Sequence, residues 1–166
     1  MAEKLVEIDK MLIKNCVNHN FVDLTNFLAT SRKDYPHCCI LACNFIEESV
    51  KTETGIDLER HMGTIYLAQR RAKCNFHQWL GYKGLIIDPT DYQFSAFYKR
   101  EAFSKLKQEL ISGTIDPHYY VEELKRSFGC NIFYKGKYEK EKNNGNDIVI
   151  KSDRVFFVKI PEIRPV

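Results

Sequence analysis

The amino-acid sequence predicts a single α+β domain, residues 1–166, in which a helix packs on an antiparallel sheet. Three observations predict this class. Apolar residues recur at helical spacing early in the chain, strand-forming segments gather towards its end, and a glycine-flanked turn in the middle joins two short apolar runs. The chain is 44% apolar and 13% aromatic, which is enough to close a core of this size.

Helices are predicted first. Residues 5–12 and 21–28 each carry apolar side chains at helical spacing on either side of the polar "NHN", where Asn20 could cap a second helix. This part of the chain therefore predicts two helices or one broken helix. The next segment, "PHCCILACNFIEESVK" (36–51), has unbroken apolar residues near its start and charges only towards its end. That pattern is typical of a buried helix.

Strands alternate with two more helices in the rest of the chain. "TIYLAQ" (64–69) has the β-branched and aromatic content of a strand, and a hairpin is predicted from 76–80 and 85–88 around Gly81–Gly84. Helices that end at glycines are predicted at 97–113 and 116–129. The final strands are predicted in "NIFYKGKY" (131–138), "DIVIKS" (147–152) and "RVFFVKI" (154–160).

Charge and composition exclude several function classes. The 25 basic and 22 acidic residues leave a net charge of +3, short of the concentrated positive field that sequence-independent nucleic-acid binding needs. No apolar run reaches the length of a membrane span, and the first fifteen residues lack a secretory signal core. The six cysteines are irregularly spaced, unlike a disulfide framework. The sequence therefore predicts no nucleic-acid or membrane partner, and a cytoplasmic location or export by a signal-independent route.

The predicted hairpin brings a histidine and an aspartate to one sheet face. If the strands fold back about Tyr82 and Lys83, His77 faces Asp88, with Cβ atoms about 4.5–5.5 Å apart. A carboxylate at that distance can accept a hydrogen bond from the imidazole and fix its tautomer. Trp79 shares this face and is predicted to shield the pair from water. Such a pair is also common at sheet margins without any chemical role.

A cysteine near a helix start supplies the matching nucleophile. Cys38 precedes the apolar helix, where unpaired N–H groups and the helix dipole lower the pKa of a thiol and can also donate to an oxyanion. Cys39 competes with it, because one residue turns a helical side chain by about 100° and only one of the two can face His77. Cys43 is predicted to be a core residue.

This ordered set of residues resembles the papain-like cysteine hydrolases and, within that clan, the transglutaminase-like branch. In that branch a cysteine opens a helix, followed by a bulky residue at the third position and a small one at the fourth. With Cys38 as nucleophile, "CCILA" places Leu41 and Ala42 there, so the resemblance favours Cys38. "HQW" (77–79) and "DPT" (88–90) match the H-x-W and D-P-T of the branch, and the resemblance spans residues 36–94.

The resemblance implies a papain/transglutaminase-like fold with a Cys38–His77–Asp88 triad and no cofactor. Such a triad attacks an amide of a protein substrate and passes through a thioester. Water or an amine then completes proteolysis, glutamine deamidation or transglutamination, of which deamidation or narrow-specificity proteolysis is expected for a chain this small. A side-chain oxyanion donor is not singled out by the sequence, although "CVNHNFVDLTN" (16–26) offers three asparagines.

Two other function classes remain open from the residues alone. "CNFH" (74–77) has zinc-ligand spacing, and His37, Cys38 and Cys39 could complete a set of four ligands. The chain could instead be a catalytically inactive protein-binding domain that uses "YKGKYEKEKNNGN" (134–146) as contact surface. The oligomeric state is not predicted.

Overall fold

The computed structural model describes residues 2–31, 38–67, 72–128, 132–138 and 148–149. Helices and antiparallel strands build it, which confirms the α+β class. Its helices are α1 (Ala2–Ser31), α2 (Cys39–Thr54), α3 (Gln93–Tyr98), α4 (Arg100–Ile111) and α5 (Pro117–Phe128). Its strands are β1 (Glu59–Leu67), β2 (Ala72–Tyr82), β3 (Leu85–Ile87), β4 (Ile132–Tyr138) and β5 (Ile148–Val149).

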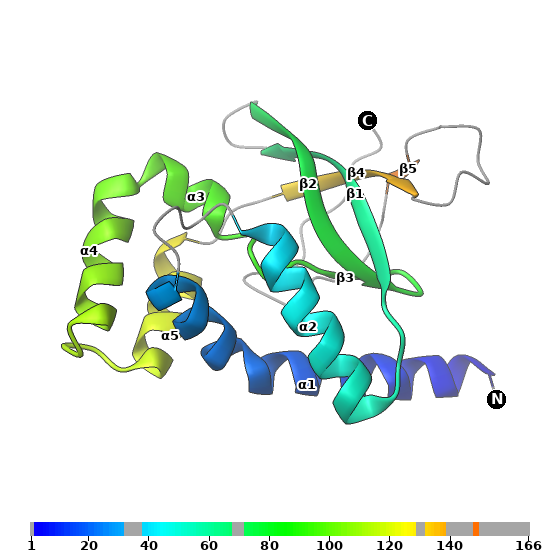
Figure 1. Ribbon diagram of the computed structural model, residues 1–166. Helices are drawn as coiled ribbons and strands as arrows, with labels where there is room; N and C mark the ends of the chain where they lie inside the picture. Colours follow the sequence, from blue (N-terminus) through cyan, green and yellow to red (C-terminus); the bar gives the residue numbers. More distant parts are fainter. Residues whose placement is uncertain (1, 32–37, 68–71, 129–131, 139–147, 150–166) are drawn as a thin grey trace.

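The sheet runs in the order β3-β2-β1-β4-β5, with every neighbouring pair antiparallel. Helix α2 lies between α1 and the sheet, and α3, α4 and α5 gather at the end of α1 opposite the N-terminus (Figure 1). None of the helices in the described part of the chain is long and apolar enough to cross a membrane.

The two faces of the sheet bury different cores. Leu80 and Ile87 point to the helical side, where they join a large apolar cluster with α1, α2, α4 and α5. Trp79 and Ile86, which precede Leu80 and Ile87 in the sequence, point to the other side of the sheet, because side chains alternate along a strand. A smaller cluster forms there from Ile65, Trp79, Ile86, Phe94 and Tyr134.

Helix α1 is continuous over 30 residues, so the predicted interruption at "NHN" is wrong. A buried stripe including Val17 and Phe21 passes across that segment and packs on α2, and tertiary packing outweighs the polar local sequence. Asn20 does not cap a helix. Its amide donates to the Cys16 carbonyl (2.9 Å) and to Glu53 at the end of α2 (2.7 Å).

Helix α2 begins at Cys39, with Cys38 as its N-cap residue. The first helical hydrogen bond runs from Ala42 N–H to the Cys38 carbonyl at 3.0 Å. Cys38 itself has non-helical dihedrals (φ −141°, ψ 25°). The helix ends at Gly55 in the left-handed conformation (φ 74°), which a glycine adopts without steric cost.

The β2–β3 hairpin has a different register from the predicted one. Tyr82 pairs with Leu85, so the turn is Lys83–Gly84, and both residues have positive φ (43° and 86°). A two-residue turn of this kind matches the twist of the strands better than one centred on Tyr82 and Lys83. Each β2 residue therefore pairs with a β3 residue two positions later in the sequence than predicted. Because side chains alternate with a period of two, the shift leaves His77 and Asp88 on one face.

A bulge interrupts β2 just before His77. Gly63 of β1 pairs with His77, whereas Ile65 pairs with Cys74, so β2 carries one extra residue between these points. Phe76 lies in the bulge with φ 64°, and its side chain is 82% exposed.

The C-terminal half differs from its prediction in detail. The helix predicted at 97–113 is two helices, α3 and α4, because the backbone breaks at Lys99 (φ −108°, ψ 43°). Helix α5 and strand β4 agree with the predicted segments, and β5 covers two residues of 147–152. The predicted strand 154–160 and most of the predicted contact surface 134–146 lie outside the described residues.

Candidate active site

The structure brings His77 and Asp88 together at the end of the hairpin. His77 Nε2 lies 2.7 Å from Asp88 Oδ2, and the two side chains are 2% and 1% exposed. Asp88 directly follows β3, and the register places it diagonally across from His77 rather than opposite it. Diagonal neighbours on one face remain within reach of long side chains. The predicted contact is therefore present, although the predicted pairing is not.

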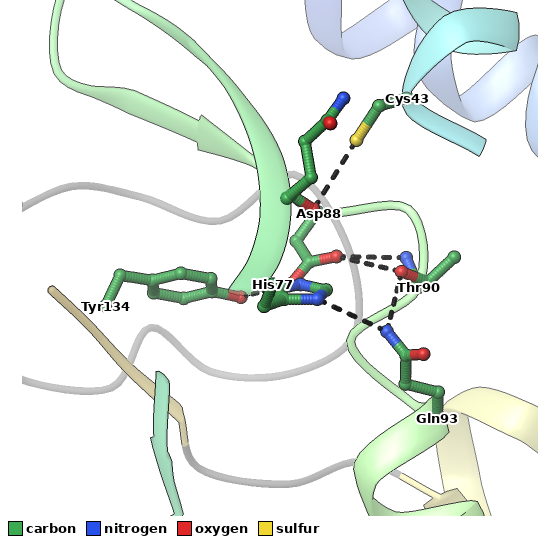
Figure 2. A network of polar contacts seen from close by, with 7 residues as sticks. Cys43, His77, Asp88, Thr90, Gln93 and Tyr134 are labelled. Atoms are coloured by element: carbon green, nitrogen blue, oxygen red, sulfur yellow. Dashed lines mark hydrogen bonds and ion pairs between the residues drawn. The ribbon is translucent and has the colours of Figure 1, made fainter. Parts of the chain in front are cut away.

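The Asp88 carboxylate is held by further hydrogen bonds (Figure 2). Thr90 donates to Oδ1 from its backbone N–H (3.1 Å) and from its hydroxyl (3.4 Å). Tyr134, on β4, donates its hydroxyl to Oδ2 at 2.9 Å. Burial acts to raise the pKa of Asp88, but the charge of His77 and these donors outweigh it and lower the pKa. Asp88 is thus kept ionised inside the protein.

Cys39, not Cys38, lies against His77, which corrects the predicted placement by one residue. The Cys39 thiol hydrogen-bonds with the His77 ring and with the backbone N–H of Gln78. Cys38 is 4% exposed and packs in the large helical core. Because α2 begins one residue later than predicted, the turn of about 100° per residue brings the second cysteine of the pair to the histidine.

The contact changes the pKa of both partners. Burial acts to raise the pKa of the Cys39 thiol, but the hydrogen bond and charge of His77 and the Gln78 N–H outweigh it, so the pKa is lowered. Burial acts to lower the pKa of His77, but Asp88 and Cys39 outweigh it and raise that pKa to about 9. Both shifts favour a thiolate beside an imidazolium near neutral pH.

Three other cysteines have a raised pKa, whereas that of Cys39 is lowered. Burial is the largest cause in each of the three. It raises the pKa of Cys16 to about 11, raises that of Cys43 well above its ordinary value, and also raises that of Cys74. Cys43 is a core residue, as predicted, and its thiol donates to the Gln78 carbonyl at 3.5 Å (Figure 2). Among these four cysteines, only Cys39 has a lowered pKa.

Aromatic and amide side chains enclose the His77 ring. Phe94 meets it edge-on with centroids 4.9 Å apart, and Trp79 stacks at 6.2 Å on the same sheet face, as predicted. Gln93 Nε2 lies 3.5 Å from His77 Nδ1 and is anchored at 2.9 Å on the Thr90 hydroxyl. Asp88 holds Nε2, so a proton exchanged with the Cys39 thiol would have to move through Nδ1, which Gln93 also contacts.

The predicted zinc ligands do not form a cluster in the described part of the chain. No group of three or more histidine, cysteine, aspartate or glutamate side chains gathers there in a geometry that could hold a metal ion. Cys74 and His77 are separated by the bulge in β2. His37, a further member of the predicted set, lies outside the described residues. Cys39 and His77 instead contact each other directly.

Sequence reasoning missed three residues of this site. Thr90 is the last residue of "DPT", and the backbone N–H two residues after an aspartate is a common local partner of its carboxylate. Gln93 begins α3, four residues before the start of the predicted helix at residue 97. Tyr134 reaches Asp88 from a strand 46 residues away. No local pattern carries that information, because it depends on β4 pairing with β1.

Comparison of the chain with protein-family models, curated proteins and solved structures finds no match. The residues and their geometry are therefore the basis for assigning a function.

Proposed function

We propose that this protein is a thiol-dependent acyltransferase or hydrolase that attacks amides of protein substrates with Cys39, His77 and Asp88. The observation that carries the proposal is the chain of contacts from the Cys39 thiol to the His77 ring and from His77 to the buried Asp88 at 2.7 Å. This is the arrangement of a nucleophile, a base and an orienting carboxylate. The start of α2 and the resemblance to papain-like hydrolases support the same reading.

Each residue has a defined step in this chemistry. The Cys39 thiolate adds to the amide carbonyl carbon, and the C=O π electrons move onto oxygen. When this intermediate collapses, the C–N bond breaks and His77 Nδ1–H protonates the leaving amine, which leaves a thioester on Cys39. Asp88 keeps the ring oriented and stabilises its positive charge. Water or an amine, deprotonated by His77, then attacks the thioester and frees the thiol.

The leaving group decides the outcome. A peptide nitrogen gives proteolysis, a glutamine side-chain nitrogen gives deamidation, and an amine acceptor gives transamidation. The triad serves all three reactions equally. We favour glutamine deamidation or cleavage of a narrow set of protein substrates.

The first test is selective alkylation of the native protein with iodoacetamide near pH 7, followed by peptide mass spectrometry. We expect Cys39 to be carboxamidomethylated first, because its thiol has a lowered pKa and the thiols of Cys16, Cys43 and Cys74 have raised ones. Cys39→Ala should abolish the fast phase, and His77→Ala should slow it.

Cys38→Ala is the matched control, since it removes the adjacent thiol. The fast phase should persist in this variant. If Cys38→Ala removes the fast phase and Cys39→Ala keeps it, Cys38 is the nucleophile. If no cysteine reacts faster than a free thiol at this pH, thiol catalysis at this site is wrong.

A further inference from the structure

A tetrahedral intermediate on Cys39 needs donors for its oxygen, and their direction is constrained by the chemistry. The leaving nitrogen must face His77, which protonates it. The negative oxygen must therefore point away from the ring. Backbone N–H groups at the start of α2, including that of Cys39, have no partner within the helix and offer one donor. The donor on the remaining side has to come from another element.

Gln78 lies beside the nucleophile. Its backbone N–H hydrogen-bonds with the Cys39 thiol, and its carbonyl accepts from Cys43 at 3.5 Å. The pairing of β3 with β2 stops at Leu80, so this part of the β2 edge is left to the thiols of α2. Strand alternation sends the Gln78 side chain to the helical face, opposite the face that carries His77.

The side-chain amide nitrogen of Gln78 is buried without a hydrogen-bond partner among the described residues. The residue is 5% exposed, and its Nε2 has no hydrogen-bond partner within the described part of the chain. An unsatisfied buried donor costs about 1–3 kcal/mol, so such groups need an explanation. A donor held in reserve for a charge that appears only during reaction is one such explanation.

We infer that the Gln78 side-chain amide donates to the oxyanion that forms on Cys39, together with the N–H of Cys39. This inference rests on the proposed function. Gln78 is then a catalytic residue that contacts the reacting carbonyl oxygen, and His77 and Gln78, consecutive on β2, serve opposite sides of the intermediate.

The test compares two reagents for the same thiol in wild type and Gln78→Met. p-Nitrophenyl acetate acetylates a thiolate through a tetrahedral oxyanion and releases p-nitrophenolate, whereas iodoacetamide alkylates it by direct displacement without one. Methionine has a similar length and no donor. We expect the acetylation rate of Cys39 to fall about tenfold or more, because loss of one such donor lowers kcat by about 10²–10³-fold in a serine protease. The alkylation rate should stay within about twofold.

Controls separate the possible outcomes. Met62→Leu changes the residue paired with Gln78 across the sheet and should leave both rates unchanged. Gln78→Leu repeats the test with a second apolar side chain, and thermal unfolding should show both Gln78 variants at least as stable as wild type. An unchanged ratio of acetylation to alkylation in the Gln78 variants would overturn this inference and spare the proposed function. A Cys39 that iodoacetamide does not label in wild type would overturn both.

Discussion

At Cys39, burial and hydrogen bonding act in opposite directions on the same thiol. Burial opposes the thiolate, as it does at Cys43 and Cys74, but contacts with His77 and the Gln78 N–H reverse the result. The difference between an inert and an activated cysteine in this protein is therefore set by contacts to a strand rather than by solvent access.

Asp88→Asn should shift the pH dependence of this thiol. The Asp88 carboxylate helps to raise the pKa of His77 to about 9, so removing its charge lowers that pKa and leaves less imidazolium at neutral pH. The pKa of Cys39 then rises, and the rise of the alkylation rate with pH moves to higher pH. We expect this shift in a pH–rate profile measured with iodoacetamide. A variant profile that superimposes on the wild-type profile would contradict the role of Asp88.

The choice between Cys38 and Cys39 shows the limit of sequence reasoning at this scale. The residue types, their order and the face shared by His77 and Asp88 all follow from local patterns. The start of α2 does not, because Cys38 and Cys39 are identical and neither offers a capping side chain that marks the boundary. The positions of Leu41 and Ala42 favoured Cys38 as the nucleophile, whereas Cys39 is the cysteine that contacts His77.

Among the elements, β2 does most to build the site, and its bulge precedes His77. Phe76 has φ 64° in this bulge, a conformation that costs a non-glycine residue about 1–2 kcal/mol. Bulges often redirect side chains next to active sites. The strain therefore lies directly before the residue that must be aimed at Cys39.

Phe76→Gly should raise the free energy of unfolding by about 1 kcal/mol relative to Phe76→Ala, because only glycine adopts this φ without cost. The Phe76 side chain is 82% exposed, so both variants lose little burial. Denaturant unfolding of the two variants gives the comparison directly. Equal stabilities would mean that the backbone of residue 76 is not strained.

The elements themselves were predictable to different degrees. Helices α2 and α5 and the β2–β3 hairpin follow from periodicity and from glycines, which act over a few residues. The continuity of α1 follows instead from packing on α2. The bulge in β2 is equally invisible in the sequence, since Phe76 is not a residue type that prefers positive φ.

Across the whole molecule, the site depends on a strand from the far end of the chain. The ring of Tyr134 on β4 packs edge-on against Trp79, with centroids 5.1 Å apart, and its hydroxyl donates to Asp88 at 2.9 Å. Strand β1 separates β4 from β2 in the sheet. The charge on Asp88 is thus coupled to the assembly of the whole sheet.

Tyr134→Phe should make the protein more sensitive to acid. The lowered pKa of Asp88 contributes stability that is present above the pKa of an unfolded aspartate and is lost as pH falls through the folded pKa. Removing one donor raises the folded pKa, so this stability is lost at higher pH. We expect the acid-unfolding midpoint, followed by circular dichroism, to move upwards.

Tyr66→Phe is the matched control, because Tyr66 lies on the neighbouring strand β1 and its hydroxyl does not hold Asp88. Its acid-unfolding midpoint should stay near that of wild type. Equal shifts in the two variants would show that the effect comes from the loss of any tyrosine hydroxyl in the sheet.

The dependence on Tyr134 has a consequence for synthesis of the chain. A ribosome releases Cys39 long before it releases β4 (Ile132–Tyr138), and a contact between two segments can form only after both have been synthesised. During that interval Asp88 lacks the hydrogen bond from the Tyr134 hydroxyl. The lowered pKa of Asp88, to which the Tyr134 hydroxyl contributes, is therefore fully established only after β4 has joined the sheet.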